Sequence, residues 1–197
     1  MGIQVLLEEI GVPYDLVQST IDMNEPRPPE QLTINPNGWI PVLIGDVAIY
    51  EAAAITIYLC DQYPLAGLAP RPDQMTRGLF LQTLVYFSSS IQNAFQLTYY
   101  PDRFAETSDG YSGVMQRGIR RLRETWQVID TQIGENQWVL GDKFSAVDIY
   151  LFMLTTWLKD SRGHPSVQDF PSVARIAKKV LLRPATLKVY SEALQIK

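Results

Sequence analysis

Residues 35–52 constrain the fold of this chain most, because they contain several different local signals in a fixed order. Asn-Pro and Asn-Gly dipeptides at the start are turn signals. Two short runs rich in β-forming residues follow at 41–44 and 47–50, and the Gly45-Asp46 pair between them is typical of a tight hairpin. From Glu51 onward the pattern becomes that of an alanine-rich helix. The stretch therefore predicts a turn, a hairpin and a helix that begins directly after the second strand.

Two features of this stretch indicate a ligand-binding site. The Ile40-Pro41 bond enters a strand, and an X-Pro bond favours trans by only about 0.5–1 kcal/mol. A cis bond there would expose the backbone N–H and C=O of Ile40 to a peptide-like ligand along the strand edge. The start of the next helix offers unpaired N–H groups to a carboxylate, and Glu51 beside it can bind an ammonium. An α-amino acid head group carries both charges and fits this pair.

The stretch also resembles the glutathione-binding signature of glutathione transferases. That signature reads Asn-Pro-x-Gly-x-Val-Pro-x-Leu, a hairpin, and Glu-Ser at a helix start followed by Ala-Ile-x-x-Tyr-Leu. The resemblance implies that Ile40, before the cis proline Pro41, pairs its backbone with the cysteinyl part of glutathione. It also implies that Glu51 and Ala52 hold the γ-glutamyl head. Glutathione is then the co-substrate, and a small electrophilic or hydrophobic molecule is the second substrate.

Two residues depart from the family pattern. Ala52 stands where the family has serine, and the lost hydroxyl hydrogen bond to a charged group corresponds to about 1.5–3 kcal/mol, or about ten- to a hundredfold in affinity. Trp39 stands where polar residues are common. Either a contact to the glycyl end of glutathione is removed, or Trp39 covers the linker or a dimer partner.

The first 64 residues fit a thioredoxin-like α/β domain whose first strand is missing. The pattern predicts a helix at 3–10 closed by Gly11, a strand at 14–18, a proline-rich loop at 24–29 and a short helix or turn at 30–34. In the family, a strand and a loop with the catalytic Ser, Tyr or Cys precede this helix. The catalytic residue is therefore expected ahead of Met1, and none is identified in the chain. Without that strand, its neighbours in the sheet lack a backbone partner.

Beyond Pro64 the sequence predicts helices only. Residues 65–72 are interpreted as a linker and residues 73–197 as an all-helical domain, which together with 1–64 matches the two-domain glutathione transferase fold. One long helical pattern runs from Asp73 to about Tyr100, and an apolar stripe predicts another from Met115 to Ile133. The position of four aromatic residues suggests a pocket for the second substrate: Tyr99, Tyr100, Phe104 and Trp157.

Residues 144–149 contain a second strong local signal. Ser145 is placed to cap a helix and to exchange hydrogen bonds with Asp148, while Phe144 and Ile149 occupy the positions of a hydrophobic staple. This capping box resembles that of the C-terminal domain of glutathione transferases. Its expected role is in folding, at about 1 kcal/mol for the cap, and no chemistry is assigned to it.

Composition excludes several classes of partner. The net charge is −4 over 197 residues and no Lys/Arg run occurs, so neither nucleic acid nor an anionic membrane is expected as a partner. The single cysteine, Cys60, predicts a cytoplasmic protein with this thiol packed in the core. With one histidine, His164, and no phosphate-binding loop, neither a metal nor a nucleotide is expected.

Three functions are compatible with the sequence. The first is a dimeric glutathione transferase that conjugates the glutathione thiolate to an electrophile. The second is a non-catalytic glutathione transferase-like binding or scaffold protein, which Ala52 favours. The third is a glutathione-dependent isomerase or thiol-exchange enzyme. The residues before Gly2 would separate these functions. Ser or Tyr there favours conjugation or isomerisation, Cys favours thiol exchange, and the absence of all three favours a scaffold.

Overall fold

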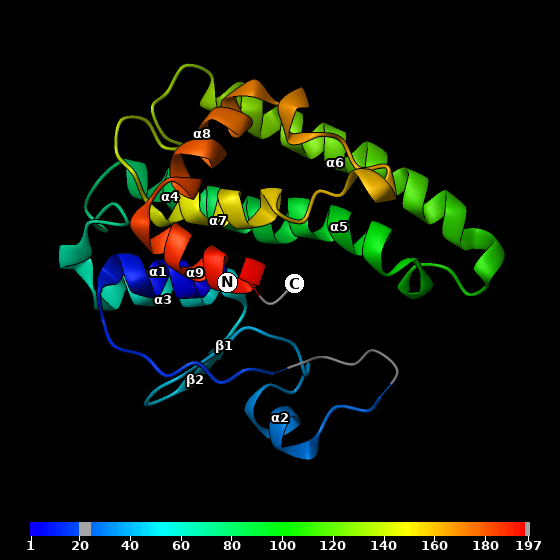
Figure 1. Cartoon of the computed structure of the whole chain (residues 1–197), viewed down its shortest axis with the longest axis horizontal. Helices are drawn as coiled ribbons and strands as arrows, with labels where there is room; N and C mark the ends of the chain where they lie inside the picture. The colour runs from blue at the N-terminus through cyan, green and yellow to red at the C-terminus, as the bar shows by residue number, and fades with distance from the viewer. Residues whose placement is uncertain (20–24, 196–197) are drawn as a thin grey trace.

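A computed structural model of the chain describes residues 1–19 and 25–195 (Figure 1). The described part is mostly helical with one small sheet. In Figure 1, α1 (Gly2–Ile10) and α3 (Ala52–Gln62) lie between the strands on one side and the longer helices on the other. The loop predicted at 24–29 begins at Asn24, which lies outside the described residues.

The sheet is an antiparallel hairpin of β1 (Val42–Ile44) and β2 (Ala48–Tyr50). Ile44 pairs with Ala48, so the connecting loop has three residues and not the two predicted from Gly45-Asp46. The β-rich runs were located correctly, but the turn takes one residue from the second run. The sheet holds β1 and β2 alone among the described residues.

The strand predicted at 14–18 is absent, and this prediction was wrong. These residues have no regular secondary structure and take part in no strand pairing. Strand pairing needs the backbone of a neighbour, and in the described part of the chain β1 pairs only with β2. An alternating sequence pattern alone therefore did not produce a strand here.

The predicted helices of the first 64 residues are present. Gly11 closes α1 in the left-handed conformation, with φ of 79° and its N–H donated to the Leu7 carbonyl at 2.9 Å. The short helix α2 (Pro29–Ile34) begins with proline at its first position, where no N–H is needed. Helix α3 ends at Gln62, and Pro64 starts a 3-10 turn (Pro64–Ala66).

The long helix predicted from Asp73 to Tyr100 is present as three consecutive parts. These are α4 (Thr76–Tyr86), the π-turn η2 (Phe87–Ile91) and α5 (Gln92–Tyr99). Helix α5 packs closely on α6 (Tyr111–Ile133) at Gly118. A Cβ atom at Gly118 would lie 2.7 Å from Thr98 Cγ2 and 2.8 Å from Leu97 Cβ, so this contact requires glycine.

The capping box predicted at Ser145 and Asp148 is present at the start of α7 (Ala146–Thr155). Asp148 is fully buried, and its carboxylate accepts the backbone N–H of Ser145 at 2.8 Å and that of Val139 at 2.8 Å. Burial raises the pKa of Asp148 to about 6, although these hydrogen bonds act in the opposite direction. The box thus fixes both the helix start and the loop that leads into it.

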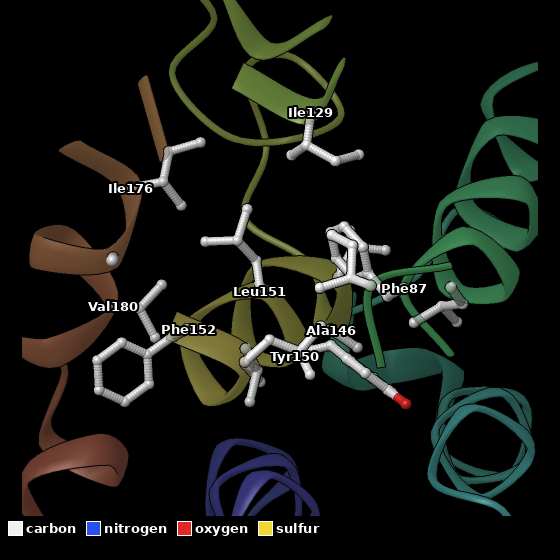
Figure 2. Close-up of a cluster of buried hydrophobic side chains, with 14 of the residues drawn as sticks. Phe87, Ile129, Ala146, Tyr150, Leu151, Phe152, Ile176 and Val180 are labelled. Carbon is white, nitrogen blue, oxygen red and sulfur yellow. The ribbon is translucent and has the colours of Figure 1, made fainter. Parts of the chain in front are cut away.

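Helix α7 lies at the centre of the hydrophobic core. Its apolar residues cover its whole circumference, which is the pattern of a fully buried helix. Figure 2 shows Phe152 beside Val180 of α8 (Pro171–Leu181), while Leu151 points toward Ile129 and Ile176. Helix α9 (Pro184–Gln195) packs beside α1. The core therefore joins the first helix of the chain to the last ones.

Candidate functional site

A cleft of about 890 Å³ opens between the hairpin end of the chain and the helices. One wall comes from the turn before β1 and the start of α3, and the other from η2, α5 and the segment after α7. The lining residues are Asn35, Trp39, Ile40, Pro41, Glu51, Ala52, Ser88, Ser89, Gln92, Asn93, Phe95, Gln96, Tyr99, Tyr100, Arg103, Thr156, Trp157 and Lys159. This volume is within the range of small-molecule sites in proteins.

The turn at Asn35 fixes the first wall. Asn35 is buried, its side-chain amide donates to the Trp39 carbonyl at 2.8 Å, and its side-chain oxygen accepts the Asn37 N–H at 3.0 Å. These bonds set the path of the chain into the Ile40-Pro41 peptide bond, which is cis. Ile40 is about half exposed at the rim of the cleft.

Glu51 has an unusual backbone conformation at the junction of β2 and α3. It is the only described residue other than glycine with positive φ, at 71°. Such a conformation costs about 1–3 kcal/mol and is often found at functional sites. Its carbonyl accepts the Ile55 N–H at 2.9 Å, while its exposed side chain lines the cleft beside Ala52. The junction thus presents a carboxylate next to the N-terminal end of a helix.

The opposite wall is aromatic and internally fixed. The Tyr99 hydroxyl donates to the Trp157 carbonyl at 2.8 Å, which joins α5 to the segment after α7. Phe95 contacts Trp157 edge to face, with 5.6 Å between ring centroids. Tyr100 lies next to Tyr99, at a centroid distance of 6.4 Å. Of the four aromatic residues predicted for a substrate pocket, Tyr99, Tyr100 and Trp157 line the cleft.

Phe104, the fourth, lies outside the cleft and is partly exposed. The 3-10 turn Pro101–Arg103 follows α5 and reverses the chain, so Arg103 lines the cleft in its place. The Arg103 guanidinium carbon lies 4.2 Å from the centre of the Tyr100 ring and 4.5 Å from that of Trp39. A helical pattern alone does not predict where such a turn directs the next side chains.

Trp39 bridges the two walls. Its ring lies 6.3 Å from that of Tyr100, so it packs against the end of α5 and against Arg103. Within the described residues, the ring contacts of Trp39 are with Tyr100, Arg103 and Arg27, while coverage of the linker or of a dimer partner stays a prediction. This packing brings the hydroxyl-bearing ring of Tyr100 close to the residue before Ile40.

Most polar residues of the cleft were not predicted. Ser88 and Ser89 come from η2, and Gln92 follows them at the start of α5. Gln92 accepts the hydroxyl of the buried Tyr150, whose pKa is raised by burial and further by the charge of Glu51. Three consecutive serines within an otherwise apolar helical run were the available signal.

His164 supports the aromatic wall from behind. It is buried, its Nδ1 accepts the Lys159 N–H at 3.2 Å, and its Nε2 lies 3.0 Å from Thr98 Oγ1. Its ring meets Phe95 and Tyr99 edge to face. Acceptance at Nδ1 requires the neutral imidazole, and burial lowers the pKa of His164.

We expect this histidine to make the fold less stable in mild acid. A pKa that is lower in the folded than in the unfolded state means that the unfolded chain binds more protons, so stability is lost as pH falls below about 6.5. Urea unfolding at pH 7.5 and pH 5 measures this loss, and His164→Gln should make it smaller. His164 is the only histidine in the sequence, so the difference between the two proteins isolates its titration. An equal loss in both would contradict the prediction.

Cys60 lies outside the cleft. Cys60 is buried in α3, and burial raises the pKa of its thiol to about 12, as expected for a packing residue. No group of three or more metal-binding side chains is found within residues 1–19 and 25–195. In the same part of the chain, no helix has the length and apolar character needed to span a bilayer.

Two family models match the chain. Residues 1–62 match the N-terminal domain and residues 112–177 the C-terminal domain of glutathione S-transferase. Glutathione S-transferase F10 of Arabidopsis thaliana is 30% identical over 78% of this chain and 74% of its own length. A sphingomonad glutathione S-transferase, solved in complex with glutathione, is 25% identical with a TM-score of 0.79, over 94% of this chain and 89% of that one. The expected fold class, a thioredoxin-like α/β part with a helical part, is confirmed.

A further relative has a different role in its name. The transcriptional regulator URE2 of Saccharomyces cerevisiae is 25% identical over 94% of this chain. The match covers 63% of URE2, so this chain spans less than two thirds of that protein.

Proposed function

The chain belongs to the glutathione S-transferase family, and from this premise we propose that it binds glutathione and transfers the glutathione thiolate to a small electrophile. The observation that carries the proposal is the single cleft shared by two kinds of wall. Ile40, Pro41, Glu51 and Ala52 lie on the wall suited to a peptide, and aromatic rings form the wall suited to an apolar substrate. Conjugation requires that these two ligands meet.

We propose the following roles on the first wall. The backbone of Ile40, beside Pro41, pairs with the cysteinyl unit of glutathione. Glu51 accepts hydrogen bonds from the γ-glutamyl ammonium, and the first N–H groups of α3 at Ala52 bind the neighbouring carboxylate. The ammonium and the carboxylate of the γ-glutamyl head would thus each bind a group of opposite charge or polarity at the start of α3.

The rest of the assignment follows from the family. We propose that residues 1–64 form the glutathione-binding domain, that 65–72 link it to the helical domain 73–197, and that the protein works as a cytoplasmic homodimer. Glutathione is the only co-substrate in this proposal. Tyr99, Tyr100 and Trp157 contact the electrophile, and Phe104 has no direct part.

Titration of glutathione into the purified chain, followed by calorimetry, tests the proposal. Saturable binding together with turnover of a chloronitroaromatic electrophile is the expected result. Binding without turnover would favour the second candidate, a non-catalytic binding protein, which the missing hydroxyl at Ala52 and the name of the URE2 relative favour. A folded chain that does not bind glutathione would overturn both. For the third candidate, a glutathione-dependent isomerase or thiol-exchange enzyme, Cys60 is no candidate nucleophile, because it is buried and lies outside the cleft.

Restoring the family hydroxyl should tighten binding. We expect Ala52→Ser to lower the Kd for glutathione about 10-fold or more, because a hydrogen bond to a charged carboxylate contributes about 1.5–3 kcal/mol. Calorimetry measures the change. Ala54→Ser is the matched control, since Ala54 lies in the same helical turn but is exposed and outside the cleft. An unchanged Kd for Ala52→Ser would show that residue 52 does not contact the glutamyl head.

A further inference from the structure

The hydroxyl groups of the cleft differ in whether they are free to donate to a ligand. Five side-chain hydroxyls line it. Four of them already donate to backbone carbonyls: Ser88 and Ser89 to Val85 at 3.1 and 2.7 Å, Tyr99 to Trp157 at 2.8 Å, and Thr156 to Met153 at 2.6 Å. The fifth, Tyr100, donates to no group within residues 1–19 and 25–195.

Tyr100 also packs against the residue that precedes Ile40. Its ring lies 6.3 Å from the ring of Trp39, which is covalently joined to Ile40. On the proposed function, the backbone of Ile40 holds the cysteinyl unit of glutathione. The cysteinyl unit would then lie next to the residue that Tyr100 packs against, in the cleft that Tyr100 lines.

The Tyr100 ring is held beside a cation. The Arg103 guanidinium stacks 4.2 Å from the ring centre, and its Nη1 donates to Gln96 Oε1 at 3.0 Å. The same guanidinium stacks on Trp39 at 4.5 Å. A positive charge held over this ring favours an anion bound in the same part of the cleft.

We infer that Tyr100 is a catalytic residue, whose hydroxyl donates a hydrogen bond to the glutathione sulfur and stabilises the thiolate, with Arg103 as a positioning residue. This inference rests on the proposed function and assigns to the helical wall a task that the family resemblance places ahead of Met1. The S–H bond of glutathione breaks and its proton passes to bulk water, while Tyr100 stays protonated. The sulfur electron pair then forms the bond to carbon, and the leaving group departs with the electron pair of its own bond.

The test compares two adjacent tyrosines of one wall. Tyr100→Phe removes the free hydroxyl, and Tyr99→Phe is the matched control for the thiol pKa alone, because its hydroxyl already donates to Trp157 while its ring is assigned to the electrophile. The thiolate is followed by ultraviolet absorbance against pH in the complex with glutathione, with the S-methylglutathione complex as the blank. For Tyr100→Phe we expect the pKa of the bound thiol to rise by about 1–2 pH units and turnover below that pKa to fall about 10- to 100-fold. The Kd for glutathione should change little.

Each outcome decides the question. A thiol pKa that rises in Tyr100→Phe and not in Tyr99→Phe supports the inference, and a smaller rise in Arg103→Gln supports the positioning role. Binding of glutathione with the same thiol pKa in Tyr100→Phe as in wild type overturns the inference and leaves the proposed function intact. Equal rises in both tyrosine variants overturn it as well, because they would report hydration of the wall. No glutathione binding by the wild type overturns the proposed function, and the inference with it.

Discussion

Replacing Glu51 with glutamine is expected to weaken glutathione binding about 10- to 100-fold, because a hydrogen bond between charged partners contributes about 1.5–3 kcal/mol. Glutamine keeps the size and shape of the side chain and removes only the charge that we assign to the γ-glutamyl ammonium. Glu51 is exposed and lines the cleft, so no core packing is lost. Calorimetric titration of glutathione at constant ionic strength measures the change.

Two further variants separate binding from folding at this position. Glu135→Gln is the charge control, since Glu135 is exposed and lies outside the cleft. Glu51→Gly also removes the carboxylate, but glycine adopts a φ of 71° readily, so we expect the free energy of unfolding to rise by about 1 kcal/mol. A more stable protein with weaker glutathione binding would show that the strained conformation of Glu51 is retained for ligand binding. Unchanged binding in both Glu51 variants would remove Glu51 from the site.

The largest effect on stability is expected at Asp148. Asp148→Ala should lower the free energy of unfolding by about 2–4 kcal/mol, because it removes a helix cap and leaves the N–H groups of Ser145 and Val139 without their acceptor. The Ser145 hydroxyl, 3.1 Å from the same carboxylate, also loses its partner. Urea unfolding followed by circular dichroism measures the change, and the melting temperature should fall by about 10 °C.

The controls for this prediction are a partial and a neutral substitution. Asp148→Asn retains one acceptor oxygen and should lose about half as much stability. Asp109→Ala changes an exposed aspartate and should stay within about 0.5 kcal/mol of the wild type. If Asp148→Ala were as stable as Asp109→Ala, the capping box would make no measurable contribution to stability, and the prediction would be wrong. Because the Asp148 carboxylate lies outside the cleft, glutathione binding by the folded variant should be unchanged.

Local signals in the sequence predicted local structure well. The hairpin, the start of α3 and the Ser145–Asp148 box were all predicted, because each depends on residues within a few positions of one another. The strand at 14–18 was not formed, since a strand depends on a partner that its own residues do not encode. The extra loop residue Val47 was missed for a similar reason, because strand register is set by both strands together.

The cleft residues likewise divide into those that a local motif predicted and those that depend on the fold. Ile40, Pro41, Glu51 and Ala52 were selected from one continuous motif, and all four line the cleft. Arg103 and Lys159 were not selected, because each lies a few residues beyond the end of an α-helix, where the helical pattern no longer predicts side-chain direction. The Trp39–Tyr100 contact joins residues that are far apart in sequence and carries no local signal. The position of the two walls relative to each other could therefore not be predicted from the sequence.

The π-turn η2 determines how far the side chains of α5 are rotated about the helix axis relative to those of α4. A π-turn holds one residue more than the α-helical turn it replaces, and one residue corresponds to about 100° of rotation about the helix axis. If the π-turn closed into regular α geometry with all its residues retained, Gln92, Gln96 and Tyr99 would turn about a quarter of a circle away from the cleft, whereas deletion of one residue of 87–91 would let the helix close with these side chains in place. Which side chains of α5 face the cleft thus depends on the π-turn as well as on the residues of α5 itself.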